Sequence, residues 1–156
     1  MCGIAGFYNP KDNYSENPKK YFSILKNMIK SMKMRGPDDE GYSIINSCCL
    51  AHTRLSIIDL DMGKQPFKIN YAGNSYHIVY NGEIYNHPEL KKKLISLGYD
   101  FTTNSDTEII GYAFIHWGPS FVKHLNGIFA IGIFDERYNS LYLFRDHFGI
   151  KPLYYK

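Results

Sequence analysis

Apolar residues in the first third of the chain follow the spacings typical of strands and of helices. Residues 2–8 (CGIAGFY) form one mostly apolar run and predict a short buried strand. From Tyr21 to Met34 apolar residues recur every three or four positions, which predicts a helix. The turn cluster 35–38 (RGPD) ends that helix, and β-rich runs predict strands at 41–45, 49–58 and 76–80.

Turn and capping signals divide the second half in the same way. Pro88 suits the first turn of a helix that Gly98 would end. Ser105 and Glu108 have the spacing of a capping box, which predicts a helix from there to Trp117. Apolar runs predict further strands at 127–134, 140–144 and 150–155, the last interrupted by the end of the chain.

This order of elements predicts an α+β fold, most economically two antiparallel sheets packed together with helices outside. The 156 residues match the usual size of one domain and contain no repeat, linker or low-complexity segment. We therefore expect one globular domain over residues 1–156. The pattern alone does not fix the topology of the sheets.

The charge, hydropathy and cysteine content of the chain argue against several classes of protein. A net charge of +3 is too small to indicate nucleic-acid binding, and no apolar run approaches the length of a membrane span. The N-terminus lacks the pattern of a secretory signal, and three cysteines with two adjacent make a poor disulfide framework. We therefore expect a cytoplasmic protein, with neither nucleic acid nor membrane as a partner. No Cys/His spacing predicts a metal site.

Cys2 is the first candidate for chemistry. A lone cysteine is more often a small buried hydrophobe than a nucleophile. If Met1 is removed, however, Cys2 carries a free α-amine whose reference pKa near 8 suits a general base. An N-terminal nucleophile that uses its own amine is an established arrangement.

Three other polar positions could complete such a site. Asn81-Gly82 is either a hairpin turn or a pair of N–H donors for an oxyanion. Arg54 lies in an apolar run, so it either faces solvent or clamps a carboxylate. Asp106 either complements a helix dipole or binds an ammonium group. Together these groups would suit an amino-acid amide such as glutamine.

The same residues carry a family resemblance. The chain resembles the glutaminase domain of class II, N-terminal nucleophile glutamine amidotransferases, and most of all the domain at the front of glutamine-dependent asparagine synthetases. The matching segments, in chain order, are MCGIAGFY (1–8), RGPDDEG (35–41), AHTRLSIIDL (51–60), GKQPF (63–67), YNGEIYNH (80–87), SDTEII (105–110), LNGIFAIGIFD (125–135) and RDHFGIKPLYY (145–155).

The resemblance implies a fold and a role for each matching residue. The fold is a four-layer α/β/β/α sandwich of two antiparallel sheets. Cys2 matches the nucleophile, which attacks the side-chain amide of L-glutamine and forms a thioester. Asn81 and Gly82 match the oxyanion hole. Arg54, beside Ile58, matches the residue that binds the α-carboxylate of glutamine, and Glu83 and Asp106 match the residues that bind its α-ammonium.

The resemblance also sets expectations about what lies outside this chain. Members of the family continue with further glutaminase strands and an ATP-using synthetase domain, whose SGGxDS-type motif this sequence lacks. We therefore expect a domain incomplete at its C-terminus, completed by a synthetase domain in cis or in trans, with a homodimer as a further partnership. No cofactor is expected here, since ATP and Mg²⁺ would serve the synthetase domain. A non-catalytic glutamine-binding fragment and an amidotransferase for a sugar or peptide acceptor remain alternatives.

Overall fold

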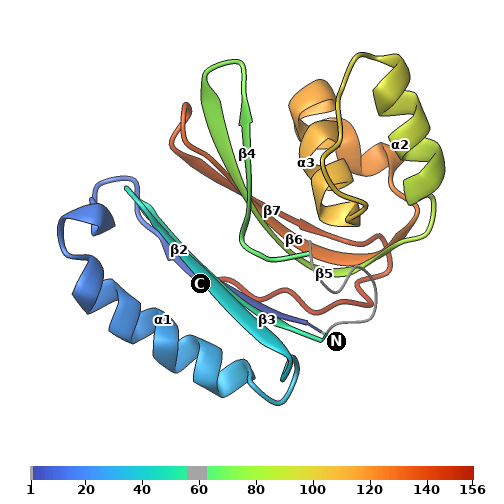
Figure 1. Ribbon diagram of the computed structural model, residues 1–156. Coiled ribbons are helices and arrows are strands. Elements are labelled where there is room, and N and C mark those ends of the chain that lie inside the picture. Colours follow the sequence, from blue (N-terminus) through green and yellow to red (C-terminus); the bar gives the residue numbers. More distant parts are fainter. Residues whose placement is uncertain (1, 56–62) are drawn as a thin grey trace.

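The computed structural model describes residues 2–55 and 63–156. Two antiparallel sheets lie face to face, and helices cover their outer faces (Figure 1). Helix α1 (Pro18–Met32) lies on the outside of the first sheet, and helices α2 (His87–Ser96) and α3 (Asp106–Trp117) lie on the outside of the second. The layers therefore run α/β/β/α, which confirms the expected fold class.

The first sheet has the strand order β1-β3-β2, with β1 at Gly3–Tyr8, β2 at Asp39–Ile45 and β3 at Cys48–Arg54. Central β3 is buried at every position because both of its faces are covered. Cys49 and Ala51 pack toward Leu25 and Ile29 of α1. Helix α1 begins earlier than the apolar pattern predicts, because Asn17 caps it by accepting a hydrogen bond from the Lys20 N–H.

The second sheet has the order β4-β5-β6-β7, with β4 at Phe67–Tyr71, β5 at Asn74–Ile84, β6 at Gly127–Asp135 and β7 at Ser140–Arg145. Strand β5 is longer than its neighbour β4. It pairs with β4 only over residues 74–78, whereas it pairs with β6 over residues 76–84. One edge of β5 from Val79 to Ile84 is therefore open to other groups.

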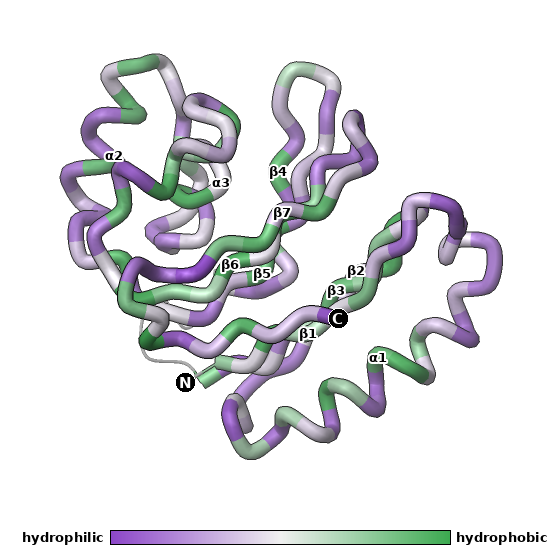
Figure 2. Tube along the Cα trace, turned by 180° about the vertical axis from the view of Figure 1, so that it is seen from behind, coloured by the Kyte–Doolittle hydropathy of each residue, from purple (hydrophilic) through white to green (hydrophobic). Residues whose placement is uncertain are grey.

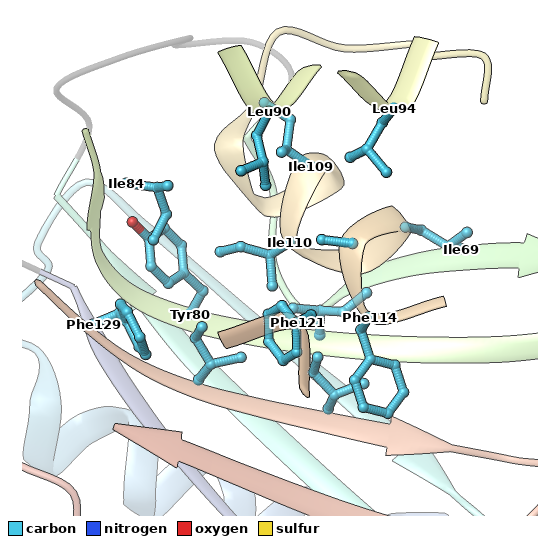
Figure 3. Close-up of a cluster of buried hydrophobic side chains, with 14 of the residues drawn as sticks. Ile69, Tyr80, Ile84, Leu90, Leu94, Ile109, Ile110, Phe114, Phe121 and Phe129 are labelled. Carbon is cyan, nitrogen blue, oxygen red and sulfur yellow. The ribbon is translucent and has the colours of Figure 1, made fainter. Parts of the chain in front are cut away.

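The largest core lies between the second sheet and its helices. Leu90 and Leu94 of α2 and Ile110 and Phe114 of α3 pack there against the sheet, with Phe121 from the 3₁₀ turn Gly118–His124 (Figure 3). A smaller core joins the two sheets. Its buried members are Ile45, Cys48, Leu50, Val79 and Phe134.

Hydropathy along the chain agrees with these layers. The strands of the second sheet carry long hydrophobic stretches, whereas α1 alternates between hydrophobic and hydrophilic residues along its length (Figure 2). That alternation fits a helix with one buried face. Among the described residues, no helix is both long enough and apolar enough to cross a membrane.

Three expectations need correction. The structure contains strand β4, which the pattern did not predict. It has no strand at 150–155, where Pro152 lacks an N–H and the Asp146 carboxylate accepts the N–H groups of Ile150 and Lys151. Strand β3 ends at Arg54, and positions 56–58 of the expected strand lie outside the described residues.

Candidate active site

A cavity of about 200 Å³ lies at the open edge of β5. Its lining draws on the residue before β1, the end of β3, strand β5 and the N-terminus of α3. Six of the seven residues expected to form the site line this cavity; Ile58 lies outside the described residues. The six are Cys2, Arg54, Asn81, Gly82, Glu83 and Asp106.

Cys2 immediately precedes β1 and is the one partly exposed cysteine of the three. Its Sγ lies 4.0 Å from the carbonyl oxygen of Leu55, and its own carbonyl accepts a hydrogen bond from Arg35 Nε at 3.4 Å. The other two thiols are fully buried. Burial raises the pKa of Cys49 to about 12 and that of Cys48 further, so both stay protonated at neutral pH. Cys2 is therefore the most accessible of the three thiols.

Alternation along β5 aims one backbone donor at the cavity. The Tyr80 N–H lies on the open edge, where it donates to Gln65 Oε1 at 2.6 Å. In an antiparallel strand every second N–H points the same way, so the Gly82 N–H lies on this edge too. Only glycine fits there, because a Cβ atom would meet the Ile128 carbonyl and come within 2.9 Å of Tyr80 Cε2.

Asn81-Gly82 is not a hairpin turn. Both residues lie inside the ladder between β5 and β6, where Asn81 pairs with Ala130 and Gly82 with Phe129. The Asn81 side chain is buried at the cavity wall. The amide of Asn81 and the N–H of Gly82 thus lie on neighbouring residues of one rigid strand.

Arg54 does not face solvent. It is the last residue of β3, it is 5% exposed, and it lines the cavity. A buried guanidinium keeps its charge and presents a planar set of N–H donors. The side chain therefore supplies a cation suited to a carboxylate.

Two carboxyl groups lie on the same cavity. Glu83 on β5 is exposed, whereas Asp106, the first residue of α3, is partly buried. Burial raises the pKa of Asp106 above its ordinary value. Four weaker influences lower it: the hydrogen bond from Tyr80, the nearby His87, and the backbone amides of Ile84 and Thr107. The Oδ2 atom of Asp106 accepts a hydrogen bond from the Tyr80 hydroxyl at 2.8 Å.

The structure adds residues to which the sequence analysis assigned no role. Tyr80, Gln65 and Lys151 line the cavity as well. Gln65 bridges two elements of the site, since it accepts from Tyr80 N and donates to Thr107 Oγ1 at 3.3 Å. Each of the three lies within a segment that carries the family resemblance, and that position was the one sequence signal that could have pointed to them. Among the described residues, no group of three or more His, Cys, Asp and Glu side chains is placed to hold a metal ion.

The cavity thus combines a thiol, an edge of backbone N–H groups, a guanidinium and two carboxyl groups on a two-sheet sandwich. These groups line one cavity between elements that are far apart in the sequence. The chain belongs to the glutamine amidotransferase domain family, whose model matches residues 1–156.

Curated relatives match along the whole chain. An asparagine synthetase [glutamine-hydrolyzing] 2 of Bacillus subtilis is 44% identical over 99% of this chain and 20% of its own length. Asparagine synthetase B [glutamine-hydrolyzing] of Escherichia coli is 37% identical over 99% of this chain and 26% of its own. Amidase chyE of Penicillium rubens is 38% identical over 99% and 24% respectively. This chain spans about a quarter of the length of these relatives.

A solved structure has the same fold. The structure described as the allosteric regulatory enzyme of purine biosynthesis superposes with a TM-score of 0.52 and 23% identity. The match covers 60% of this chain and 23% of the solved one. At this identity the likeness supports the two-sheet sandwich.

Proposed function

We propose that this domain hydrolyses the side-chain amide of L-glutamine to glutamate and ammonia through a thioester on Cys2. One observation carries the proposal: the Cys2 thiol shares a single cavity with the Gly82 backbone edge, Arg54 and Asp106. Membership of the glutamine amidotransferase family and the names of the relatives agree with it.

The charged groups of the cavity would hold the amino-acid end of glutamine. Arg54 pairs with the α-carboxylate through two N–H donors. Asp106 and Glu83 accept hydrogen bonds from the α-ammonium. A substrate held at both charges has a fixed orientation, so its side-chain amide points toward Cys2.

The chemistry follows from the thiol and the donors. After removal of Met1, the α-amine of Cys2 takes the thiol proton, and Sγ attacks the amide carbon. Asn81 Nδ2 and the Gly82 N–H stabilise the oxyanion. The amine then protonates the leaving nitrogen, ammonia departs, and the thioester remains. Water attacks the thioester, which releases glutamate and restores the thiol.

The acceptor of the ammonia lies outside this chain. The relatives named asparagine synthetases favour aspartate as the acceptor, converted to asparagine by a synthetase domain in cis or in trans. ATP and Mg²⁺ would serve that domain, and hydrolysis at Cys2 needs no cofactor in this scheme. The protein would act where glutamine is abundant, in the cytoplasm.

The test is Cys2-dependent release of glutamate from glutamine by the purified protein. We expect Cys2→Ala to abolish release and Cys49→Ala, which removes a buried thiol, to retain it. Intact mass should show that Met1 is absent. Iodoacetamide at neutral pH should label Cys2 ahead of the other two cysteines. Release of glutamate by Cys2→Ala at the wild-type rate would refute the proposal, as would a protein that binds glutamine without turning it over.

A further inference from the structure

Tyr80 connects two parts of the cavity that the proposed chemistry uses separately. Its side chain lies on the helix side of β5, beside Ile84 (Figure 3), and is 4% exposed. The ring passes beneath Gly82, and the hydroxyl lies 2.8 Å from Asp106 Oδ2. One side chain therefore contacts both the strand that carries the oxyanion donors and the carboxyl group at the start of α3.

The direction of this hydrogen bond is fixed. Burial, together with the negative charge of Asp106, raises the pKa of Tyr80 far above its ordinary value. The phenol therefore keeps its proton at any physiological pH, and it can act only as a donor to the carboxylate. A hydrogen bond donated to a carboxylate stabilises its charged form, so Tyr80 lowers the pKa of Asp106 while burial raises it.

We propose that Tyr80 is a positioning residue for the substrate ammonium, acting through Asp106. The phenol O–H donates to Oδ2 of Asp106 and so fixes the orientation of this carboxylate, which lines the cavity. It also keeps Asp106 ionised inside a buried site, where an ammonium ion needs a full negative charge as its partner. This inference rests on the proposed function, since it gives Tyr80 a role in binding the ammonium group of the substrate in the same cavity.

The charged groups around Asp106 come from several elements. Apart from Tyr80, the ionisable neighbours in or beside the cavity are Cys2, Arg54, Glu83, His87 and Lys151. Removal of the Tyr80 hydroxyl changes none of these charges. A changed response to pH in that variant therefore reports on the Tyr80–Asp106 hydrogen bond.

The experiment compares Tyr80→Phe with Tyr112→Phe in glutamine hydrolysis. Tyr112 lies on the same helix as Asp106 and packs in the aromatic cluster with Tyr71, Tyr99 and Phe101. We expect Tyr80→Phe to raise KM about tenfold with kcat changed less than about twofold, as for loss of a hydrogen bond to a charged group. Tyr112→Phe should leave both constants unchanged. The acid limb of kcat/KM should move to higher pH in Tyr80→Phe, since Asp106 would protonate more easily.

A double-mutant cycle separates positioning from a general structural effect. If Tyr80 acts through Asp106, then Tyr80→Phe added to Asp106→Asn should change KM by less than about twofold. An equal rise in KM in both backgrounds would overturn the proposal. A fall in kcat at unchanged KM would overturn it as well.

Affinity measurements in the Cys2→Ala background distinguish failure of this inference from failure of the proposed function. Calorimetry there gives Kd for L-glutamine without turnover. Absence of Cys2-dependent hydrolysis in the wild type refutes the proposed function. An unchanged Kd on adding Tyr80→Phe to Cys2→Ala refutes the positioning role, whether or not the wild type hydrolyses glutamine.

Discussion

His52 is a histidine enclosed between the two sheets with one ring nitrogen unpaired. It lies on β3, two residues before Arg54, and is 1% exposed. Among the buried side-chain polar atoms of the described residues, its Nε2 has no hydrogen-bond partner. Burial, followed by the positive charge of Arg54, lowers the pKa of His52 to about 4. The folded protein therefore holds this ring neutral.

The lowered pKa makes the stability of the fold depend on pH. An unfolded chain binds a proton at this histidine below pH 6.5, whereas the folded chain excludes that proton down to about pH 4. Stability from this residue is fully present above pH 6.5 and is lost as pH falls toward 4, by about 3 kcal/mol in all. Urea unfolding at pH 7, 6 and 5 should show this decline, and His52→Gln should flatten it.

His147→Gln is the matched control, because His147 is exposed. It should leave the slope of unfolding free energy against pH as in the wild type. His77, whose pKa burial also lowers, adds a decline of the same sign in every variant, so the comparison rests on the difference between them. A slope unchanged in His52→Gln would show that His52 does not exclude its proton.

At the scale of single residues, the sequence identified the charged and reactive groups better than their contacts. Cys2, Arg54 and Asp106 could be selected because reactive or charged residues in apolar or terminal positions of a sequence are informative. Tyr80 could not be selected in this way, because a tyrosine in a strand is explained by its β-propensity alone. The direction of its hydroxyl depends on which face of the strand packs against α3. The Tyr80–Asp106 contact is thus a product of tertiary packing.

Glu108 holds the loop before α3 and does not cap the start of that helix. The S-x-x-E spacing predicted that it would cap the start of α3 together with Ser105. Ser105 does cap, accepting from the Thr107 N–H at 3.2 Å. Glu108 instead accepts four hydrogen bonds, from the backbone N–H and the hydroxyl of Thr102 and of Thr103. This buried carboxylate fastens the loop between α2 and α3.

We expect Glu108→Gln to destabilise the fold by about 3 kcal/mol. The amide has nearly the same shape, but its NH₂ would face two donors that need an acceptor. Glu89→Gln, at an exposed position in the first turn of α2, should cost under about 1 kcal/mol. Chemical unfolding of both variants measures the difference. Equal costs would mean that the four contacts contribute little net stability.

Elements with a strong period could be predicted, and elements fixed by side-chain contacts could not. Helix α1 and strands β6 and β7 follow their apolar patterns closely. Strand β4 is five residues long and directly follows Pro66, so its pattern was too short to stand out. The false strand at 150–155 has an apolar sequence, but the carboxylate of Asp146 removes backbone donors that a strand would need.

At the scale of the molecule, the cavity exists because two sheets and one helix meet. Arg54 belongs to the first sheet and Cys2 directly precedes its strand β1, whereas Gly82 belongs to the second sheet and Asp106 to α3. Residues far apart in the chain thus line one cavity. Sequence could suggest these partners by their chemistry, but the order and registry of the strands decide that they share a cavity.

This arrangement predicts that glutamine stabilises both sheets together. In Cys2→Ala, where turnover is blocked, L-glutamine at ten times its Kd should raise the unfolding free energy by about 1.4 kcal/mol. Arg54→Ala and Asp106→Asn should each lose most of this gain at the same concentration, although the first residue lies in β3 and the second starts α3. Thermal unfolding with D-glutamine, which carries the same charges at an inverted centre, is the ligand control.

Hydrogen exchange locates the effect. Because the ligand would bridge β3, β5 and the start of α3, amides in all three should exchange more slowly when L-glutamine binds. The outer face of α1 does not reach the cavity, so protection there should follow only the global rise in stability. Protection restricted to one sheet would mean that the ligand contacts one side alone. Either Arg54 or Asp106 would then lie outside its binding site.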